Sequence, residues 1–188
     1  MPRETRRRIT EPEAIEALAH PIRLELMDYL MAQGPATAST CARAVGDTPS
    51  NCSYHLRVLA KVGLVEEASS ADGRERPWRA LVTGFDADVD SEGRLAPEAA
   101  DLLALTLQRD QRMIREHLAR REELPRRWRT ADVYSHYTLR LTPKELTELN
   151  AQLDALIRPY IAATREDAPR GAGLVRLGLQ AFPKEIDR

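Results

Sequence analysis

The sequence predicts a mainly α-helical fold with a small β component. Apolar residues recur at three- and four-residue intervals over most of the chain, which is the spacing of one helix face. Two short runs on either side of Asp72-Gly73 predict a hairpin, because Asp-Gly favours the tight turn between two strands. We therefore expect helices and a hairpin first, then a long helix and a small α/β region.

Composition limits the classes of function. With 188 residues, 43% of them hydrophobic, the chain suits one average domain or two small ones with a packed core. The net charge of −1 gives no overall attraction to nucleic acid, so any such affinity must come from local patches. No apolar run approaches the roughly 20 residues that span a bilayer, and the N-terminus lacks the apolar stretch of a signal peptide. We expect a cytoplasmic protein with no membrane partner.

Three helical segments are expected before residue 48. Residues 1–10 form a basic N-terminal arm, for which a frayed terminus is the alternative. The first helix begins at a capping box of Thr10 and Glu13, and Pro21 opens the second. The expected stops and turns are His20-Pro21, Gly34-Pro35 and Gly46-Asp47, and the third helix is Ser39 to Val45.

Residues 48–65 carry the most informative pattern. Thr48 and Pro49 favour a helix start, and Gly63 favours its end. One side is apolar, with Cys52, Leu56, Leu59 and Val62, and the other is polar, with Ser50, Asn51, Ser53, Tyr54, Arg57 and Lys61. There is no acid between Thr48 and Lys61, whereas a solvated helix face usually carries acids as well as bases. This pattern is typical of a helix that reads DNA.

A hairpin is expected directly after this helix. Leu64 to Ala68 and Arg76 to Thr83 read as its strands, and Pro77 restricts the second to an edge. Helices followed by such a hairpin predict a winged helix-turn-helix domain over residues 11–83. Arg74, Arg76 and Arg79 would place positive charge on the wing, although Glu75 lies between two of them and could partly neutralise them.

Three stretches resemble the ArsR family of bacterial transcription regulators over residues 12–82. They are Glu16-Ala-Leu-Ala-His-Pro-Ile-Arg-Leu-Glu-Leu-Met, Ser53-Tyr-His-Leu-Arg-Val-Leu and Gly63-Leu-Val. The resemblance implies that the chain binds a double-stranded DNA operator and regulates transcription, with repression the expected sign. It also implies a homodimer, because helices that flank the winged domain pair two subunits in this family.

The residues expected at the DNA are Ser50, Asn51, Ser53, Tyr54, His55, Arg57 and Lys61 in the helix and Arg74 and Arg76 in the wing. Asn51 suits an adenine edge and Arg57 a guanine or a phosphate. His55 follows the family pattern and either orients the helix or touches phosphate. The alternative is an ordinary exposed face in a winged helix that contacts proteins. Residues 1–83 support this alternative, because they contain eleven basic and eleven acidic residues.

Metal sensing is not expected, although many ArsR-like proteins use cysteine pairs or Asp and His ligands. Residues 39–45 contain Cys41 alone, and the long helix offers Asp110 and His117 without a second histidine. Cys41 and Cys52 suit reduced core positions, with a thiol redox switch as the alternative. The sequence contains no cofactor fingerprint and no GxSxG, HExxH or Walker motif, so we expect neither a cofactor nor catalysis.

Residues 84–97 read as an acidic linker, and residues 98–188 as a dimerisation and effector domain. A long helix is expected from Ala99 to about Leu124, and its apolar side needs a partner, either a second subunit or its own chain. The residues expected on that side are Leu103, Leu107, Met113, Ile114, His117 and Leu118.

Beyond the long helix we expect a strand, a helix and a second strand. Val133 to Leu141 and Leu174 to Phe182 alternate as strands do, and Thr142 caps a helix that runs to about Ala163. Its buried stripe would be Leu146, Leu149, Leu153, Leu156, Ile157 and Tyr160. A lone pair of strands is marginal, so this unit should pack on the long helix or on a second subunit.

A small-molecule effector is a candidate partner of the C-terminal part. Trp128, Tyr134 and Tyr137 could line a pocket for it. The clusters Arg120-Arg121 and Arg126-Arg127-Trp128-Arg129 could bind an acidic ligand or nucleic acid. Core packing of the aromatic rings and a solvated helix end are the alternatives.

Overall fold

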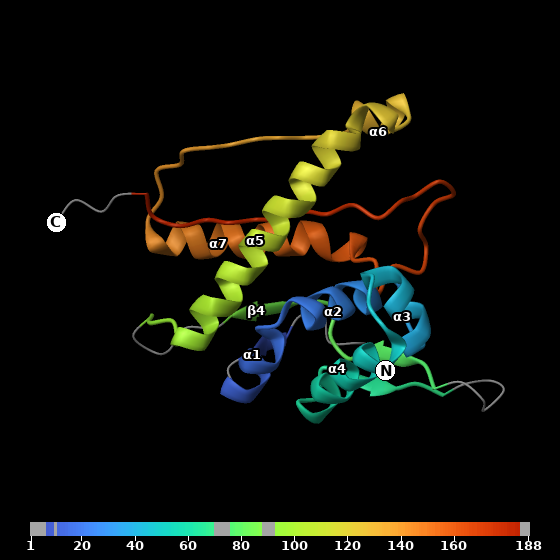
Figure 1. Cartoon of the computed structure of the whole chain (residues 1–188). Coiled ribbons are helices and arrows are strands. Elements are labelled where there is room, and N and C mark those ends of the chain that lie inside the picture. The colour runs from blue at the N-terminus through green and yellow to red at the C-terminus, as the bar shows by residue number, and fades with distance from the viewer. Residues whose placement is uncertain (1–6, 10, 70–75, 88–92, 185–188) are drawn as a thin grey trace.

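The computed structural model describes residues 7–9, 11–69, 76–87 and 93–184 (Figure 1). The helices are α1 (Pro12–Leu18), α2 (Pro21–Gln33), α3 (Ala38–Val45), α4 (Pro49–Lys61), α5 (Pro97–Arg120), α6 (Arg126–Arg129) and α7 (Pro143–Ile157), with 3-10 turns η1 (Arg121–Glu123) and η2 (Arg158–Tyr160). The strands are β1 (Arg7–Ile9), β2 (Val65–Glu67), β3 (Trp78–Ala80) and β4 (Phe85–Ala87). The prediction of a mainly helical fold with a winged helix-turn-helix domain and a long helix is confirmed.

Local capping signals set the ends of α3 and α4. The hydroxyls of Thr37 and Thr48 each accept a hydrogen bond from the amide three residues further on, at 3.2 Å. Gly46, with φ of 71°, ends α3 in the left-handed conformation, and Gly63, with φ of 69°, follows the last turn of α4. The expected start of α4 is therefore confirmed, whereas α3 begins one residue earlier than expected because Thr37 is its cap.

The start of α1 differs from the prediction. Its capping residue is Glu11, whose side chain makes no capping hydrogen bond, and Pro12 is the first helical residue. The expected cap Thr10 lies outside the described residues. Pro12 favours this start because a proline has no amide to leave unpaired in the first turn.

The wing is a short antiparallel pair. Val65 lies opposite Ala80 and Glu67 opposite Trp78, and an additional bridge joins Trp78 to Ala36. β3 is shorter than the strand expected from Arg76 to Thr83, while the predicted Asp72-Gly73 turn lies outside the described residues. Because Trp78 is buried and bridges to the segment before α3, the base of the wing belongs to the helical core.

Two segments expected to lack regular structure pair with each other. β1 from the N-terminal arm and β4 from the acidic linker form a parallel ladder, with Arg7 opposite Phe85 and Ile9 opposite Ala87. Ile9 is fully buried, so a frayed terminus is the wrong description of residues 7–9. A parallel ladder needs a partner far along the chain, which a local pattern does not reveal.

One hydrophobic core holds the first part of the chain together. All the buried apolar side chains of the described residues lie between Ile9 and Leu102. The largest fully buried ones are Ile9, Leu18, Leu26, Met27, Leu30, Leu56, Leu59, Leu64 and Leu102. α5 joins this core through Ala99 and Leu102 and packs on α1. The core therefore extends past residue 98, where we expected a separate domain to begin.

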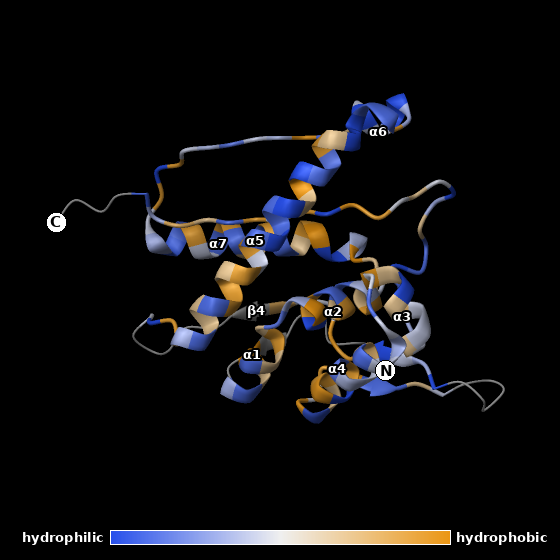
Figure 2. Ribbon diagram, in the orientation of Figure 1, coloured by the Kyte–Doolittle hydropathy of each residue, from blue (hydrophilic) through white to orange (hydrophobic). Residues whose placement is uncertain are grey.

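The second part of the chain is packed differently. Residues 133–141 and 174–182, expected as strands, are extended segments outside any ladder, and Figure 1 draws them as plain tubes. α7 ends at Ile157 instead of Ala163. Of its predicted buried stripe, Leu146, Leu149, Leu153 and Ile157 are half-buried, whereas Leu156 and Tyr160 are 70% and 66% exposed. Figure 2 shows hydrophobic positions recurring along α7 and both extended segments. A strand needs a hydrogen-bonded neighbour, and the described part of the chain supplies none to these two segments.

None of the helices among the described residues is long and apolar enough to cross a membrane.

Candidate nucleic-acid interface

Helix α4 has one side in the core and one side in solvent. Cys52, Leu56 and Leu59 are fully buried, and α4 packs against α2 and α3 through this apolar side. The predicted contact residues Ser50, Asn51, Tyr54, Arg57 and Lys61 are exposed, and Ser53 is half-buried. Within the described part of the chain neither Arg57 nor Lys61 forms an ion pair, so both cations are available to an anionic partner.

His55, predicted at the DNA, is a buried residue in the core of the chain. Its side chain is only 7% exposed, and its ring centroid lies 4.5 Å from that of His20 at the start of α2. The Tyr54 ring meets it edge-on at 5.2 Å. This packing supports the other role that the sequence left open for His55, which is to orient helix α4.

The two histidines are partly removed from solvent near the charge of Arg23. Burial lowers the pKa of both imidazoles; Arg23 lowers that of His20 further, and His20 and then Arg23 lower that of His55. The Nδ1 atoms of His20 and His55 are buried without a hydrogen-bond partner among the described residues. Neutral imidazoles are therefore the stable form at this contact between α2 and α4.

Asn51 is held at the N-terminal end of the exposed side. Its Nδ2 donates to Asp47 Oδ2 at 2.7 Å, and the Thr48 amide donates to Asp47 Oδ1 at 2.6 Å. These bonds, the backbone one first, lower the pKa of Asp47. One amide hydrogen and the carbonyl oxygen of Asn51 remain, and these two groups match the acceptor and donor of an adenine edge.

The wing cations are not equivalent. Arg79 donates through Nε to Glu66 Oε1 at 2.6 Å, and the two residues are register partners on β3 and β2. Arg76 has an 81% exposed side chain, with Nη1 3.9 Å from Glu67. Arg74 lies outside the described residues. Glu66, on the opposite strand, therefore neutralises Arg79. The sequence pattern does not reveal this pair, because it shows only Glu75 as an acidic neighbour of the wing cations.

The thiols of Cys41 and Cys52 are both buried. Burial raises the pKa of the Cys41 thiol to about 11, and burial followed by the Asp47 charge raises that of Cys52. Both side chains are therefore held as thiols, the form that reacts poorly with oxidants and metals.

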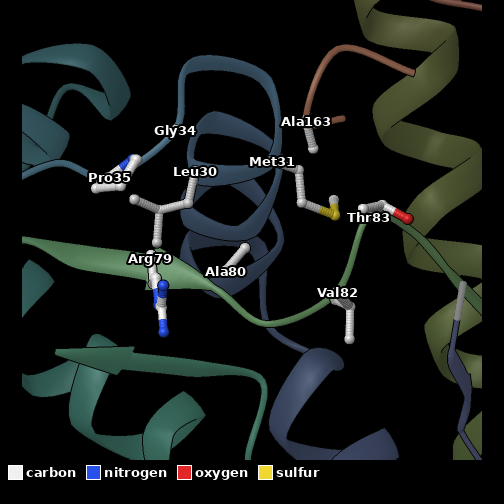
Figure 3. Close-up of a pocket in the computed structure, with 9 residues that line it drawn as sticks. All are labelled: Leu30, Met31, Gly34, Pro35, Arg79, Ala80, Val82, Thr83 and Ala163. Carbon is white, nitrogen blue, oxygen red and sulfur yellow. The ribbon is translucent and has the colours of Figure 1, made fainter. Parts of the chain in front are cut away.

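A shallow pocket lies where α2, the base of the wing and the segment after η2 meet (Figure 3). Its lining is Leu30, Met31, Gly34, Pro35, Arg79, Ala80, Val82, Thr83 and Ala163. The aromatic residues predicted to line an effector pocket lie elsewhere, with Tyr134 54% exposed and Tyr137 80% exposed. Ala163 brings the C-terminal part of the chain into the lining of this pocket, where Arg79 and Ala80 of the wing also lie.

Comparison with known proteins agrees with this geometry. The family model described as "Helix-turn-helix domain" matches residues 18–68, which contain α2, α3, α4 and β2. A search of curated proteins finds no significant match.

Two solved structures are similar to the chain. One is the solution NMR structure of the homodimeric winged helix-turn-helix DNA-binding domain of Mb0332 from Mycobacterium bovis, a possible ArsR-family transcriptional regulator. It has 25% sequence identity and a TM-score of 0.35, covering 54% of this chain and 79% of that one. The other is the crystal structure of the Mycobacterium tuberculosis MarR family protein Rv2887 in complex with salicylic acid. It has 23% identity and a TM-score of 0.29, covering 77% of this chain and 85% of that one.

The α3–α4 pair, the β2–β3 wing and the matched family model define a winged helix-turn-helix DNA-binding domain. This domain supports a transcription regulator of the winged helix-turn-helix class.

Proposed function

We propose that the chain is a sequence-specific double-stranded DNA-binding regulator, an ArsR-like homodimeric repressor that is not controlled by metal. The observation that carries the proposal is the exposed side of α4, which has cations and hydrogen-bonding groups but no acid from Thr48 to Lys61. Its other side is anchored in the core, so the helix is presented rigidly to a major groove.

The proposed contacts divide into two kinds. Asn51 and Arg57 read base edges, because their side chains offer the hydrogen bonds that adenine and guanine take in the major groove. Ser50, Ser53, Tyr54 and Lys61 on α4 and Arg74 and Arg76 on the wing contact bases or phosphates and position the domain. Arg79 is left out of this set because Glu66 neutralises it.

The homodimer is supported by α5. Leu103, Leu107, Ile114 and Leu118 have exposed fractions of 44%, 37%, 52% and 51%, so the apolar side expected to need a partner is not covered by the rest of the described chain. A two-fold pair of α5 helices would cover these residues and present two α4 helices to neighbouring major grooves, about 34 Å apart.

The release signal in this proposal is a small molecule. The buried, protonated cysteines argue against thiol oxidation. Among the described residues no three His, Cys, Asp or Glu side chains converge as a metal site would require. Native mass spectrometry of purified protein should reveal a bound organic ligand, and a stoichiometric metal ion would contradict the proposal.

Binding to promoter fragments at several salt concentrations tests the DNA reading. The parent should lose affinity steeply as salt rises, because cations released from phosphates drive association. Arg57→Ala should reduce the preference between fragments by about 5-fold or more, since one bidentate base contact is worth roughly 1–3 kcal/mol. Arg76→Ala should weaken all fragments alike and flatten the salt dependence.

The matched control is Lys144→Ala, which removes one positive charge from a side chain that is 86% exposed on α7. It should leave binding unchanged. Absence of salt-dependent binding by the parent would sink the DNA reading. It would favour a winged helix that contacts proteins, the alternative supported by the balanced charge of residues 1–83.

A further inference from the structure

Two extended segments of the C-terminal part have an apolar side that the chain leaves uncovered. In residues 174–182, Val175, Leu177 and Leu179 alternate with polar or small residues and are 73%, 56% and 58% exposed. In residues 133–141, Tyr137 and Leu139 are 80% and 58% exposed in the same alternating pattern. Period-two alternation is the pattern of a β-strand with one buried face.

The polar side of residues 174–182 is anchored to the rest of the chain. Arg176 donates to Asp28 of α2 at 2.9 Å and to Asp110 of α5 at 2.7 Å. A Cβ on Gly178 would lie 3.7 Å from Asp110 Oδ2, and one on Gly173 would lie 3.0 Å from the Trp128 ring. Val175, Leu177 and Leu179 lie on the opposite side of the alternation from Arg176 and Gly178, and all three are exposed.

Residues 133–141 are fixed at both ends. Just before them, Asp132 accepts a hydrogen bond from Arg121 at 2.9 Å and lies 3.4 Å from His117 Nε2. Just after them, Thr142 and Glu145 form the capping box of α7. The nine residues between these anchors are extended and carry one formal charge, that of Arg140.

The backbone of both segments lacks partners as well. Within the described part of the chain, no backbone–backbone hydrogen bond involves residues 132–141 or 173–184. An edge of unpaired amides and carbonyls beside exposed apolar side chains is a template for another strand. A surface of this kind is rare on a monomer that functions alone.

The size of the apolar surface fits a stable interface. The apolar residues that share the odd-numbered sides of the two segments include Val133, Tyr137, Leu139, Val175, Leu177 and Leu179, with exposed fractions of 76%, 80%, 58%, 73%, 56% and 58%. Of these, Tyr137 alone presents about 160 Å², since a whole aromatic side chain has about 200 Å². A standard interface buries about 800 Å² on each partner, so the aliphatic residues of the same two segments bring the surface into that range.

We propose that residues 133–141 and 174–182 form a β-sheet with the same segments of a second copy of this chain. The inference rests on the homodimer of the proposed function and names a surface for it in addition to α5. A second copy suits these segments, because a two-fold axis can pair an unpaired strand edge with its own copy antiparallel and so cover its apolar side. Since Arg176 ties one strand to α2, the dimer sheet is joined directly to the DNA-binding core.

Light scattering of the full chain after size-exclusion chromatography tests the surface. The parent should be a dimer, and Leu177→Glu and Tyr137→Glu should each raise its dissociation constant by at least about 100-fold, because each dimer would bury two unpaired carboxylates. Leu81→Glu is the matched control, since Leu81 is an exposed leucine at the wing, 38% exposed. It should leave the dimer intact.

Hydrogen exchange of the parent provides a test that needs no variant. Amides of residues 133–141 and 174–182 should be protected in the dimer and exchange at least 100-fold faster when dilution yields the monomer. Fast exchange in an intact dimer, protection that persists in the monomer, or a dimer unaffected by both glutamates would each overturn the inference.

The proposed DNA-binding function and the proposed intermolecular sheet can be refuted independently of each other. A monomeric parent that binds promoter DNA would overturn the intermolecular sheet and leave the DNA-binding function in place. A dimer that loses assembly with both glutamates but never binds DNA would support the sheet and refute the DNA function.

Discussion

Leu56 and Leu177 are the same residue type in opposite environments, the first fully buried and the second 56% exposed. Leu56 belongs to residues 9–102, where the core is complete within one chain. Leu177 belongs to residues 103–184, which hold sixteen of the nineteen large exposed apolar side chains found among the described residues. The difference teaches that residues 9–102 bury their apolar side chains within one chain, whereas residues 103–184 leave many of theirs in solvent, where the proposed dimer would cover them.

The largest expected effect contrasts these two leucines. Leu56→Ala should lower the free energy of unfolding by about 2–5 kcal/mol, because it opens a cavity in a packed core. Leu177→Ala should change it by less than about 0.5 kcal/mol under conditions where the chain is monomeric. Urea denaturation followed by circular dichroism measures both. Equal losses at the two positions would show that the second region is packed like the first.

Two matched caps give the next contrast. Thr48 and Thr142 each accept an amide hydrogen bond at 3.2 Å, at the starts of α4 and α7. Thr48→Ala should cost about 1 kcal/mol of global stability, since α4 is part of the core. Thr142→Ala should fray α7 alone, which hydrogen exchange detects, and leave the thermal midpoint of the first region in place. A shift of that midpoint by Thr142→Ala would contradict the separation.

The His20–His55 contact makes the stability of the first region depend on pH. Both pKa values are lowered from about 6.5 in the folded chain, so the unfolded chain binds more protons in mildly acidic solution. The free energy of unfolding should be flat above about pH 7.5 and should fall as the pH drops through 6.5, the ordinary pKa of the unfolded histidines. Urea denaturation between about pH 5.5 and 7.5 measures this dependence, because this range extends roughly one pH unit on either side of the ordinary histidine pKa of 6.5.

His55→Gln should flatten that pH dependence. The matched control is His136→Gln, because His136 is exposed in the second region. A parent whose stability rises on acidification through this range would contradict the neutral histidine pair.

The smallest expected effect concerns the ion pairs that join the two regions. Arg176 bridges Asp28 and Asp110, and its side chain is 41% exposed. Partly exposed pairs of this kind contribute about 0.2–1 kcal/mol. Arg176→Ala should therefore speed amide exchange in residues 174–182 while changing global stability little. Arg158→Ala, which breaks the exposed pair with Asp154 inside α7, should leave that exchange unchanged.

Much of the first region follows from local sequence rules. Thr48 and Gly63 mark the limits of α4, and the spacing of Cys52, Leu56 and Leu59 selects its buried side, as predicted. The capping box of Thr142 also forms as predicted, because its partners are only three residues apart. These features could be predicted from the sequence because each depends on a few neighbouring residues.

Other features of the fold could not be predicted from neighbouring residues. The burial of His55 depends on His20, which lies one helix earlier and meets it only after α2 and α4 pack. The pairing of β1 with β4 unites two segments nearly eighty residues apart, and neither has a strand pattern of its own. The predicted strands at 133–141 and 174–182 were wrong for the single chain because alternation reports a strand's sides and not its hydrogen-bonded neighbour.

Caps, turns and the polar side of α4 can thus be read from the chain, because they depend on hydrogen bonds and spacing within about four residues. Only the folded arrangement shows that Glu66 neutralises Arg79, that the core reaches α5, and that Arg176 links the C-terminal segment to α2. These contacts depend on which surfaces meet after the elements pack, and burial and charge pairing are decided there.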